Sequence, residues 1–433
     1  MSRIVRRVLE AAAVAATLAC CTSTPPPAAD QAYKSRAVTR TEGGLRVSSA
    51  VLSADESATV YGVPLAKRLI QPVWIEVENR EDHAYYLLSP GLDPNFFPAS
   101  EASESFEAIE SSKRRIELDR RFRELAFRNP ILPGSTASGF VLTNLDEGFK
   151  FVQIDLVTQG RARTFTILAS VPGFRSDYRA TEVFRREIYP PGKIVNYTDD
   201  TAFRSALEAL PCCATNKDGS KNGDPLNLVV VGGLDDAFPA FARRGWRPTE
   251  DKWSGSIMKT AISALANERY PYAPVSDLYL FGRPQDLALQ KARDNVHQRN
   301  HLRLWLSPLR HHGKQVWVGQ ISRDIGSRVT IHTPTLTTHK IDPDVDEARG
   351  ALTQDLAYSE ALAKIGYVKG VGPVPKSAPR GNLTTDPYYT DGLRSVLVFD
   401  VRPTSLAEVE FFPWETPRST DDKPVNATGR ADP

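Results

Sequence analysis

Short apolar or alternating runs, separated by turn residues, follow one another between residues 41 and 173, which is the pattern of β-strands. Six strands are predicted, at residues 45–52, 71–79, 84–88, 138–143, 149–157 and 164–171. The charged stretch 99–127 carries apolar residues at helical spacing, namely Phe106, Ile109, Ile116, Phe122 and Leu125. We therefore expect residues 41–173 to form an immunoglobulin-like β-sandwich with a helical insertion.

Residues 174–223 are predicted to be a connector with helical pieces at 181–187 and 200–210. Residues 224–400 then alternate between strand and helix patterns. Strands are expected at 226–231, 275–281, 301–306, 316–322 and 395–399, and helices at 235–243, 254–266 and 344–365. The Pro-rich residues 401–433 are expected to be a flexible tail. The chain is therefore predicted to be α+β, with a mixed α/β second domain.

At the N-terminus, three arginines precede a short apolar run at residues 11–19. This run has less than half of the roughly 20 apolar residues that a membrane-spanning helix needs. A basic segment followed by a short apolar one is typical of a signal peptide, which we predict for residues 1–20. Residues 21–40 include three consecutive prolines and are expected to be an extended linker.

The run Thr17-Leu18-Ala19-Cys20-Cys21 resembles the lipobox of bacterial lipoproteins, in which small residues precede the cysteine that is acylated. Ala19 makes Cys20 the favoured lipidation site, and Cys21 is the alternative. Two or more acyl chains, such as palmitate, attach a protein stably to a membrane. Because neither cysteine is followed by Asp, the resemblance implies a lipoprotein anchored to the outer membrane on its periplasmic face.

The charge balance narrows the range of partners. The chain has 54 Lys and Arg residues against 52 Asp and Glu residues, and nucleic acid is not an expected partner because its binding needs a strongly basic surface. The expected partners are a membrane, through the lipid anchor, and an envelope protein or an anionic ligand. No phosphate-binding loop, nucleophile elbow or zinc-protease motif is present, and no metal or cofactor is predicted.

Motifs that carry a family likeness occur in the second half of the chain. They are DPLNLVVVG at 224–232, GW at 245–246, APVSDLYLFGRPQD at 273–286, HLRLW at 301–305, VWVG at 316–319 with Arg323-Asp324, and THKIDPDVD at 338–346 with Arg349. Together they resemble the LssY C-terminal domain over about residues 224–369. Such domains occur alone or attached to membrane proteins, including phosphatidic-acid-phosphatase-like ones. Phosphatase chemistry is not implied here, because Val329 takes the place of the histidine that the phosphatase motif needs after Ser322-Arg323.

Histidines are concentrated in one part of the chain. Six of the seven lie between residues 297 and 339, namely His297, His301, His311, His312, His332 and His339. On a strand, His301 and Arg303 share one face, which either binds an anion or is a solvated face. His311 and His312 precede Gly313 and are expected to be exposed in a hairpin turn.

The segment from His339 to Arg349 has two interpretations. In the first, Asp342, Asp344 and Asp346, which are close to His339 in the sequence, hold a divalent cation or provide an acid/base pair. Alternatively, Asp342 caps a helix that begins at Pro343, and Asp346 pairs with Arg349 three residues later. Arg323-Asp324 is either a buried ion pair or part of an anion site.

Cys212 and Cys213 are adjacent in the sequence. They form a vicinal disulfide, remain two buried thiols, or bridge to Cys21, and the sequence leaves these alternatives open.

Two functions follow from these patterns. The first is a non-catalytic ligand- or protein-binding module on an envelope lipoprotein. The alternative is a hydrolase that acts on an anionic, phosphorylated envelope substrate. Its catalytic residues would be His339, Asp342 and His301, and its ligand-binding residues Arg303, Arg323, Asp324, Asp346 and Arg349.

Overall fold

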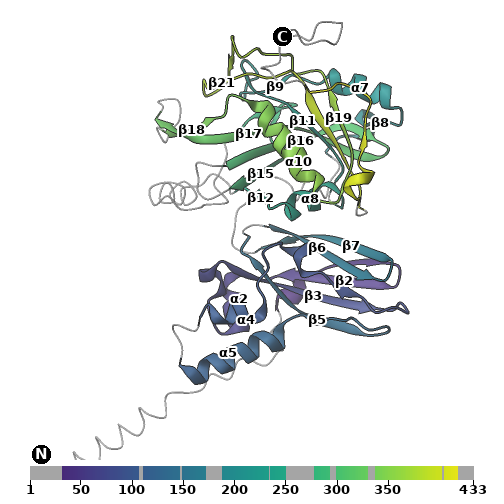
Figure 1. The fold of residues 1–433 in the computed structure, drawn as a ribbon, viewed down its shortest axis with the longest axis vertical. Coiled ribbons are helices and arrows are strands. Elements are labelled where there is room, and N and C mark those ends of the chain that lie inside the picture. The colour runs from purple at the N-terminus through teal and green to yellow at the C-terminus, as the bar shows by residue number, and fades with distance from the viewer. Residues whose placement is uncertain are drawn as a thin grey trace, which may run out of the picture.

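The structure is a computed structural model that describes residues 32–106, 111–146, 149–171, 188–233, 235–249, 277–292, 299–329, 337–401 and 404–417. The protein is α+β, with an N-terminal lobe (32–171) and a C-terminal lobe (188–417) that are stacked along the long axis (Figure 1). Within the described ranges, no helix has the length and apolar character that a membrane span requires.

Two sheets pack against each other in the N-terminal lobe. One has the order β1(Val38–Glu42), β2(Leu45–Val51), β3(Ile70–Asn79), β5(Thr136–Asn144), and the other β4(Tyr86–Leu87), β6(Phe149–Thr158), β7(Arg161–Ser170). Apolar side chains from both sheets, among them Val73, Ile75, Val152 and Ile154, form a buried core. All six predicted strands are present. Strand β1 was not predicted because its residues are mostly polar and exposed.

Helices cover the outer face of the four-stranded sheet. They are α2(Ala54–Tyr61), α4(Ala99–Glu104) and α5(Ser112–Leu125), with the short α3(Ser89–Leu92) nearby. Phe122 and Tyr61 pack with Trp74 and Phe140 of the sheet. The predicted helical insertion is therefore two separate helices that form a third layer. Ile116 lies in α5, as its spacing predicted, but its side chain is 72% exposed. Ile109 lies outside the described residues.

A ten-stranded sheet forms the centre of the C-terminal lobe. Its order is β12(Arg247–Pro248), β15(Leu287–Ala292), β16(Arg299–His311), β17(Lys314–Val329), β11(Leu228–Val231), β22(Arg394–Phe399), β19(Leu362–Val368), β23(Glu410–Phe411), with β8(Val195–Tyr197) beside β16 and β18(Thr337–Ile341) beside β17. A smaller sheet has the order β10(Asn222–Pro225), β9(Cys213–Thr215), β13(Tyr279–Leu280), β14(Arg283–Pro284).

Both faces of the large sheet are covered. Helices α8(Ala237–Arg243) and α10(Val345–Ala357) pack on the face that carries Leu302 and Leu304 of β16. Helix α7(Asp200–Glu208) and the smaller sheet cover the other face, where Phe203 and Trp305 are fully buried. Burial on both sides explains the uninterrupted apolar run of β11.

Two predicted elements of the C-terminal lobe are wrong. The helix expected at 344–365 ends at Ala357, and β19 begins at Leu362, within the range predicted to be helical. Between them Glu360 has a positive φ of 59°, a left-handed conformation that a helix cannot continue through. The expected tail contains β23, which pairs with β19 because Phe412 and Trp414 stack on each other and anchor this segment. The predicted helices at 181–187 and 254–266 and the N-terminal segment 1–31 lie outside the described residues.

The two lobes meet through β6 and α8. Phe151 of β6 stacks on Phe238 of α8, with ring centroids 6.0 Å apart. Arg247 of β12 pairs with Asp146 and lies 3.6 Å from Asp93. Burial alone would raise the pKa of Asp146, but the charges of Arg247 and Lys150 outweigh it and lower this pKa to about 2.

Candidate functional site

Strands β16 and β17 carry most of the predicted site residues, and their register sorts these residues onto two faces. His301 lies opposite Ser322, and Arg303 lies opposite Gln320. Because side chains alternate along a strand, Arg323 points to the other face, the one covered by α10. The structure therefore does not bring Arg323 together with His301 and Arg303, as the anion-site hypothesis needs.

His301 belongs to a buried ionic group at the start of β16. Its Nε2 lies 3.1 Å from Oδ2 of Asp324, and Nε of Arg299 lies 3.8 Å from the same oxygen. Burial lowers the pKa of His301, although the charge of Asp324 opposes this effect. The imidazole is therefore neutral at pH 7. We name Arg299, His301 and Asp324 the closed cluster.

Arg303 lies further along the same face. It donates a hydrogen bond of 2.8 Å from Nη1 to Oε1 of Gln320 and is only 7% exposed. The interpretation as a solvated strand face is therefore wrong, because His301 and Arg303 are both covered. Burial also raises the pKa of nearby Asp224, against the lowering effect of Arg303.

Arg323 and Asp342 pair on the α10 side of the sheet. Nε of Arg323 donates to Oδ2 of Asp342 at 3.1 Å, and its Nη1 donates to Glu347 at 3.0 Å. Asp342 was wrongly predicted to cap α10. The cap is Asp344, whose side chain accepts hydrogen bonds from the backbone of Asp346 and Glu347, because the helix begins at Val345 and not at Pro343.

Asp346 and Arg349 form an ion pair, as the spacing predicts, with 3.3 Å between Oδ1 and Nη1. Arg349 also makes two 2.8 Å hydrogen bonds to Asp391, and Thr390 donates to Asp346 at 2.7 Å. Burial raises the pKa of Asp346, with Arg349 opposing this effect. The network ties the start of α10 to the chain before β22.

His339 lies in β18, opposite Ser327 of β17. Its side chain lies outside the described part of the structure. The proposed catalytic set of His339, Asp342 and His301 is therefore not assembled by the described residues, since Asp342 and His301 lie on opposite faces of the sheet.

A cavity of about 510 Å³ opens at the end of the large sheet beside α10. Its charged lining residues are Lys291, Arg299, Arg323, Asp324 and Asp355. Trp246, Asn300, Ile325, Ala351 and Leu352 complete the lining. Two predicted ligand-binding residues, Arg323 and Asp324, are thus among the residues that line this cavity, near the end of β17.

A comparison with protein families finds a match within the C-terminal lobe. Residues 205–393 match the model of the family described as LssY C-terminus. This segment is an LssY C-terminal domain. The match begins in α7 and ends directly before β22, so it extends beyond the predicted range of 224–369 on both sides. No curated protein and no solved structure matches the chain.

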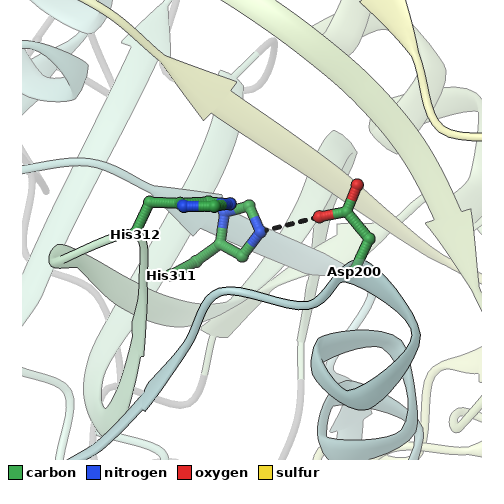
Figure 2. Close-up of side chains that lie close together, drawn as sticks. All are labelled: Asp200, His311 and His312. Carbon is green, nitrogen blue, oxygen red and sulfur yellow. Dashed lines mark hydrogen bonds and ion pairs between the residues drawn. The ribbon is translucent and has the colours of Figure 1, made fainter.

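A second polar group, which the sequence did not predict, lies at the hairpin end of β16 in the LssY C-terminal domain. Figure 2 shows His311 pointing toward Asp200, with His312 beside it. Nε2 of His311 lies 3.0 Å from Oδ1 of Asp200, and the two imidazole centroids are 4.5 Å apart. The hairpin and the exposure of His312 were predicted correctly, but His311 is buried. We name these three residues the open cluster.

Electrostatics favour a charged carboxylate beside a neutral imidazole in the open cluster. Burial tends to raise the pKa of Asp200, but hydrogen bonds from His311 and Lys364 outweigh it and lower this pKa. Burial lowers the pKa of His311. Asp200 was missed because it is 111 residues from His311 in the sequence, and only the pairing of β8 with β16 brings the two together.

The cysteines lie away from both clusters. Cys212 and Cys213 form a disulfide at the start of β9, with Cα atoms 3.8 Å apart. The predicted lipidation sites, Cys20 and Cys21, lie outside the described residues.

Proposed function

We propose that this chain is a lipid-anchored cell-envelope protein whose LssY C-terminal domain binds an anionic ligand without transforming it chemically. The observation that carries the proposal is the cavity beside α10. A recess of about 510 Å³ is within the usual size of a small-ligand site, roughly 300–1,000 Å³.

The charges around the cavity favour an anion. Its lining includes the partly exposed cationic side chains of Lys291 and Arg323 and the carboxylate of Asp355, whereas the side chains of Arg299 and Asp324 are buried in the closed cluster. Asp355 is already held by Arg244 at 2.8 Å and by Lys291 at 2.8 Å. Lys291 and Arg323 are each about a third exposed, so both can turn toward a ligand that enters from solvent.

The engagement of Asp342 supports binding rather than catalysis. A general acid or base must reach the reacting proton, within hydrogen-bond distance. Asp342 instead accepts hydrogen bonds from Arg323 and from the backbone N–H of Asp344, at 3.0 Å for the latter. His301 is 5% exposed and lies on the opposite face of the sheet.

Calorimetric titration of the full chain tests the binding function. The probes are inorganic phosphate and glycerol 3-phosphate, with uncharged glycerol as the negative control. The double variant Lys291→Gln/Arg323→Gln is expected to weaken binding at least about tenfold, which corresponds to roughly 1.4 kcal/mol. Lys221→Gln, an exposed lysine in the β9–β10 loop, should leave binding unchanged. Absence of binding, or equal binding by the double variant, would contradict the proposal.

The same proteins test the hydrolase alternative. Asp342 is the residue to examine, because it pairs with Arg323, which lines the cavity. Release of inorganic phosphate from glycerol 3-phosphate is followed over time. We expect none. Turnover that disappears in Asp342→Asn, while glycerol 3-phosphate still binds, would replace the binding function with the hydrolytic one.

The anchor and the N-terminal lobe complete the proposal. We infer that Cys20 carries the lipid and that the two facing sheets form an immunoglobulin-like sandwich that contacts an envelope protein partner. Cys20→Ser is expected to move the chain from the membrane fraction to the soluble fraction. Mass spectrometry that finds an intact, unmodified Met1 on cytosolic protein would exclude the anchor.

A further inference from the structure

Three ligand-type side chains converge at the turn between β16 and β17. His311 is the last residue of β16, and the two-residue turn His312-Gly313 follows it with φ values of 48° and 80°. These positive φ values define a tight hairpin that holds the two imidazoles next to each other. Strand β8 pairs with the end of β16 and leads directly into α7, whose first residue is Asp200.

The spacing of the donor atoms suits a metal ion. One ligand atom from each of Asp200, His311 and His312 lies within 4.8 Å of the other two. Around a tetrahedral ion with bonds of about 2.0–2.2 Å, ligand atoms are roughly 3.4 Å apart. The 3.0 Å between Nε2 of His311 and Oδ1 of Asp200 is already close to this separation. We propose that Asp200, His311 and His312 bind a divalent transition-metal ion of the Zn²⁺ type.

Neighbouring residues hold the first two ligands in place. The ring of His311 stacks on Phe203, with centroids 4.2 Å apart and 22° between the planes. Lys364 contacts Oδ2 of Asp200 at 3.3 Å, which leaves Oδ1 directed at His311. Outer contacts of this kind fix the orientation of metal ligands and raise affinity.

The donor set selects the class of metal. Two imidazoles and one carboxylate suit zinc, nickel or copper, whereas calcium and magnesium take oxygen ligands almost exclusively. His312 is exposed, so the site can be reached from solvent at this residue. Three protein ligands with an open fourth position are the arrangement of zinc sites that keep a water or a second ligand.

One neighbour opposes metal binding. Lys364 is a cation that lies 3.8 Å from Glu410 and 4.0 Å above the ring of Phe412 as well as beside Asp200. Its charge is thus shared between two carboxylates and an aromatic face. We therefore expect a dissociation constant for Zn²⁺ in the micromolar range rather than the far tighter binding of structural zinc sites.

Titration of the full chain with Zn²⁺ under non-reducing conditions tests the site. His312→Asn removes an imidazole but keeps the fold, because Asn-Gly is the preferred sequence for this type of turn. Asp200→Asn removes the charge at the same side-chain size. Each is expected to weaken binding at least about tenfold. His83→Asn is the matched control, since His83 is an exposed histidine beside Asp82 in the N-terminal lobe.

Co²⁺ provides a second readout. Tetrahedral coordination by imidazole and carboxylate gives visible absorption that should appear with wild type and His83→Asn and be lost in His312→Asn. The site is refuted if Zn²⁺ binds no tighter than about 100 μM, which is roughly −5.5 kcal/mol. It is equally refuted if either cluster variant binds Zn²⁺ as tightly as wild type, or if His83→Asn weakens binding as much as they do.

Discussion

The two ends of the β16–β17 pair carry polar clusters that are built in opposite ways. In the closed cluster, the side chains of Arg299, His301 and Asp324 are 0%, 7% and 4% exposed. In the open cluster, the side chain of Asp200 is 42% exposed, and His312 faces solvent. The same two strands thus have a buried ionic group at one end and, at the other, a buried His311 between two accessible side chains, those of Asp200 and His312.

The difference in burial separates structural from binding roles. A charge that is removed from water must be matched by partners within the protein, so removing one partner leaves the other uncompensated. The charges of the closed cluster are therefore mainly architectural. A carboxylate near the surface depends less on its partners and remains able to exchange them for a ligand. Exchange of partners for a ligand at the open cluster is therefore expected to cost little folding stability.

Removing the carboxylate of the closed cluster is expected to have the largest effect. Asp324→Ala leaves the buried guanidinium of Arg299 without the carboxylate that lies 3.8 Å away. We expect the free energy of unfolding to fall by about 3–5 kcal/mol, measured by urea denaturation of the full chain.

Asp200→Ala at the open cluster is the matched comparison. Its carboxylate is half-exposed and faces Lys364 and His311, so we expect a loss of less than about 1 kcal/mol. Similar losses for Asp200→Ala and Asp324→Ala would remove the distinction between the two clusters.

Zinc is expected to stabilise the chain through the open cluster only. Saturation at about 100 times the dissociation constant is expected to stabilise the chain by roughly 2.7 kcal/mol, and a chelator should reverse this gain. His301 and His311 are ten residues apart on one strand, a separation of roughly 30 Å. At that distance effects add, so Asp324→Ala should gain as much from zinc as wild type does. A gain that depends on Asp324 would show that the ends are coupled.

Alternation patterns predicted strands well and helix ends poorly. Strand β11 was found because its apolar run is uninterrupted, whereas β19 was assigned to a helix because α10 precedes it after a turn of only a few residues. Residues 401–433 are predicted to be a tail because the sequence does not reveal that Phe412 packs on the sheet. Local patterns report local preference, and these errors occur where a distant contact decides the structure.

The site was predicted in part. Sequence spacing gave the pair Asp346–Arg349 and the shared face of His301 and Arg303. The sequence could not show that Arg323 lies on the other face of the sheet from His301 and Arg303. That separation follows from strand alternation only once the register of β16 and β17 is known. The open cluster needed a contact between β8 and β16, which no local pattern encodes.

The buried imidazole of the closed cluster should make stability depend on pH. Burial lowers the pKa of His301 below 6.5, so the unfolded chain binds a proton that the folded chain does not as pH falls through that value. Folding stability contributed by neutral His301 is therefore present above about pH 6.5 and is lost on acidification. Urea midpoints at about pH 8 and pH 5.5 should differ less in His301→Gln than in wild type. An equal pH dependence in both proteins would show that His301 is not the group responsible.

The smallest expected effect is on the stability of metal-free His312→Asn. The histidine occupies a left-handed conformation with φ of 48°, which costs energy for most residues but is well tolerated by asparagine. Its backbone N–H donates to the carbonyl of Tyr197 at 2.9 Å, and the substitution leaves that bond intact. The unfolding free energy should therefore change by no more than about 0.5 kcal/mol, and the change should favour the variant. A residue that is slightly unfavourable for folding but supplies an exposed imidazole beside His311 and Asp200 is what a binding site requires. A large loss of stability would instead show that the His312 ring supports the hairpin.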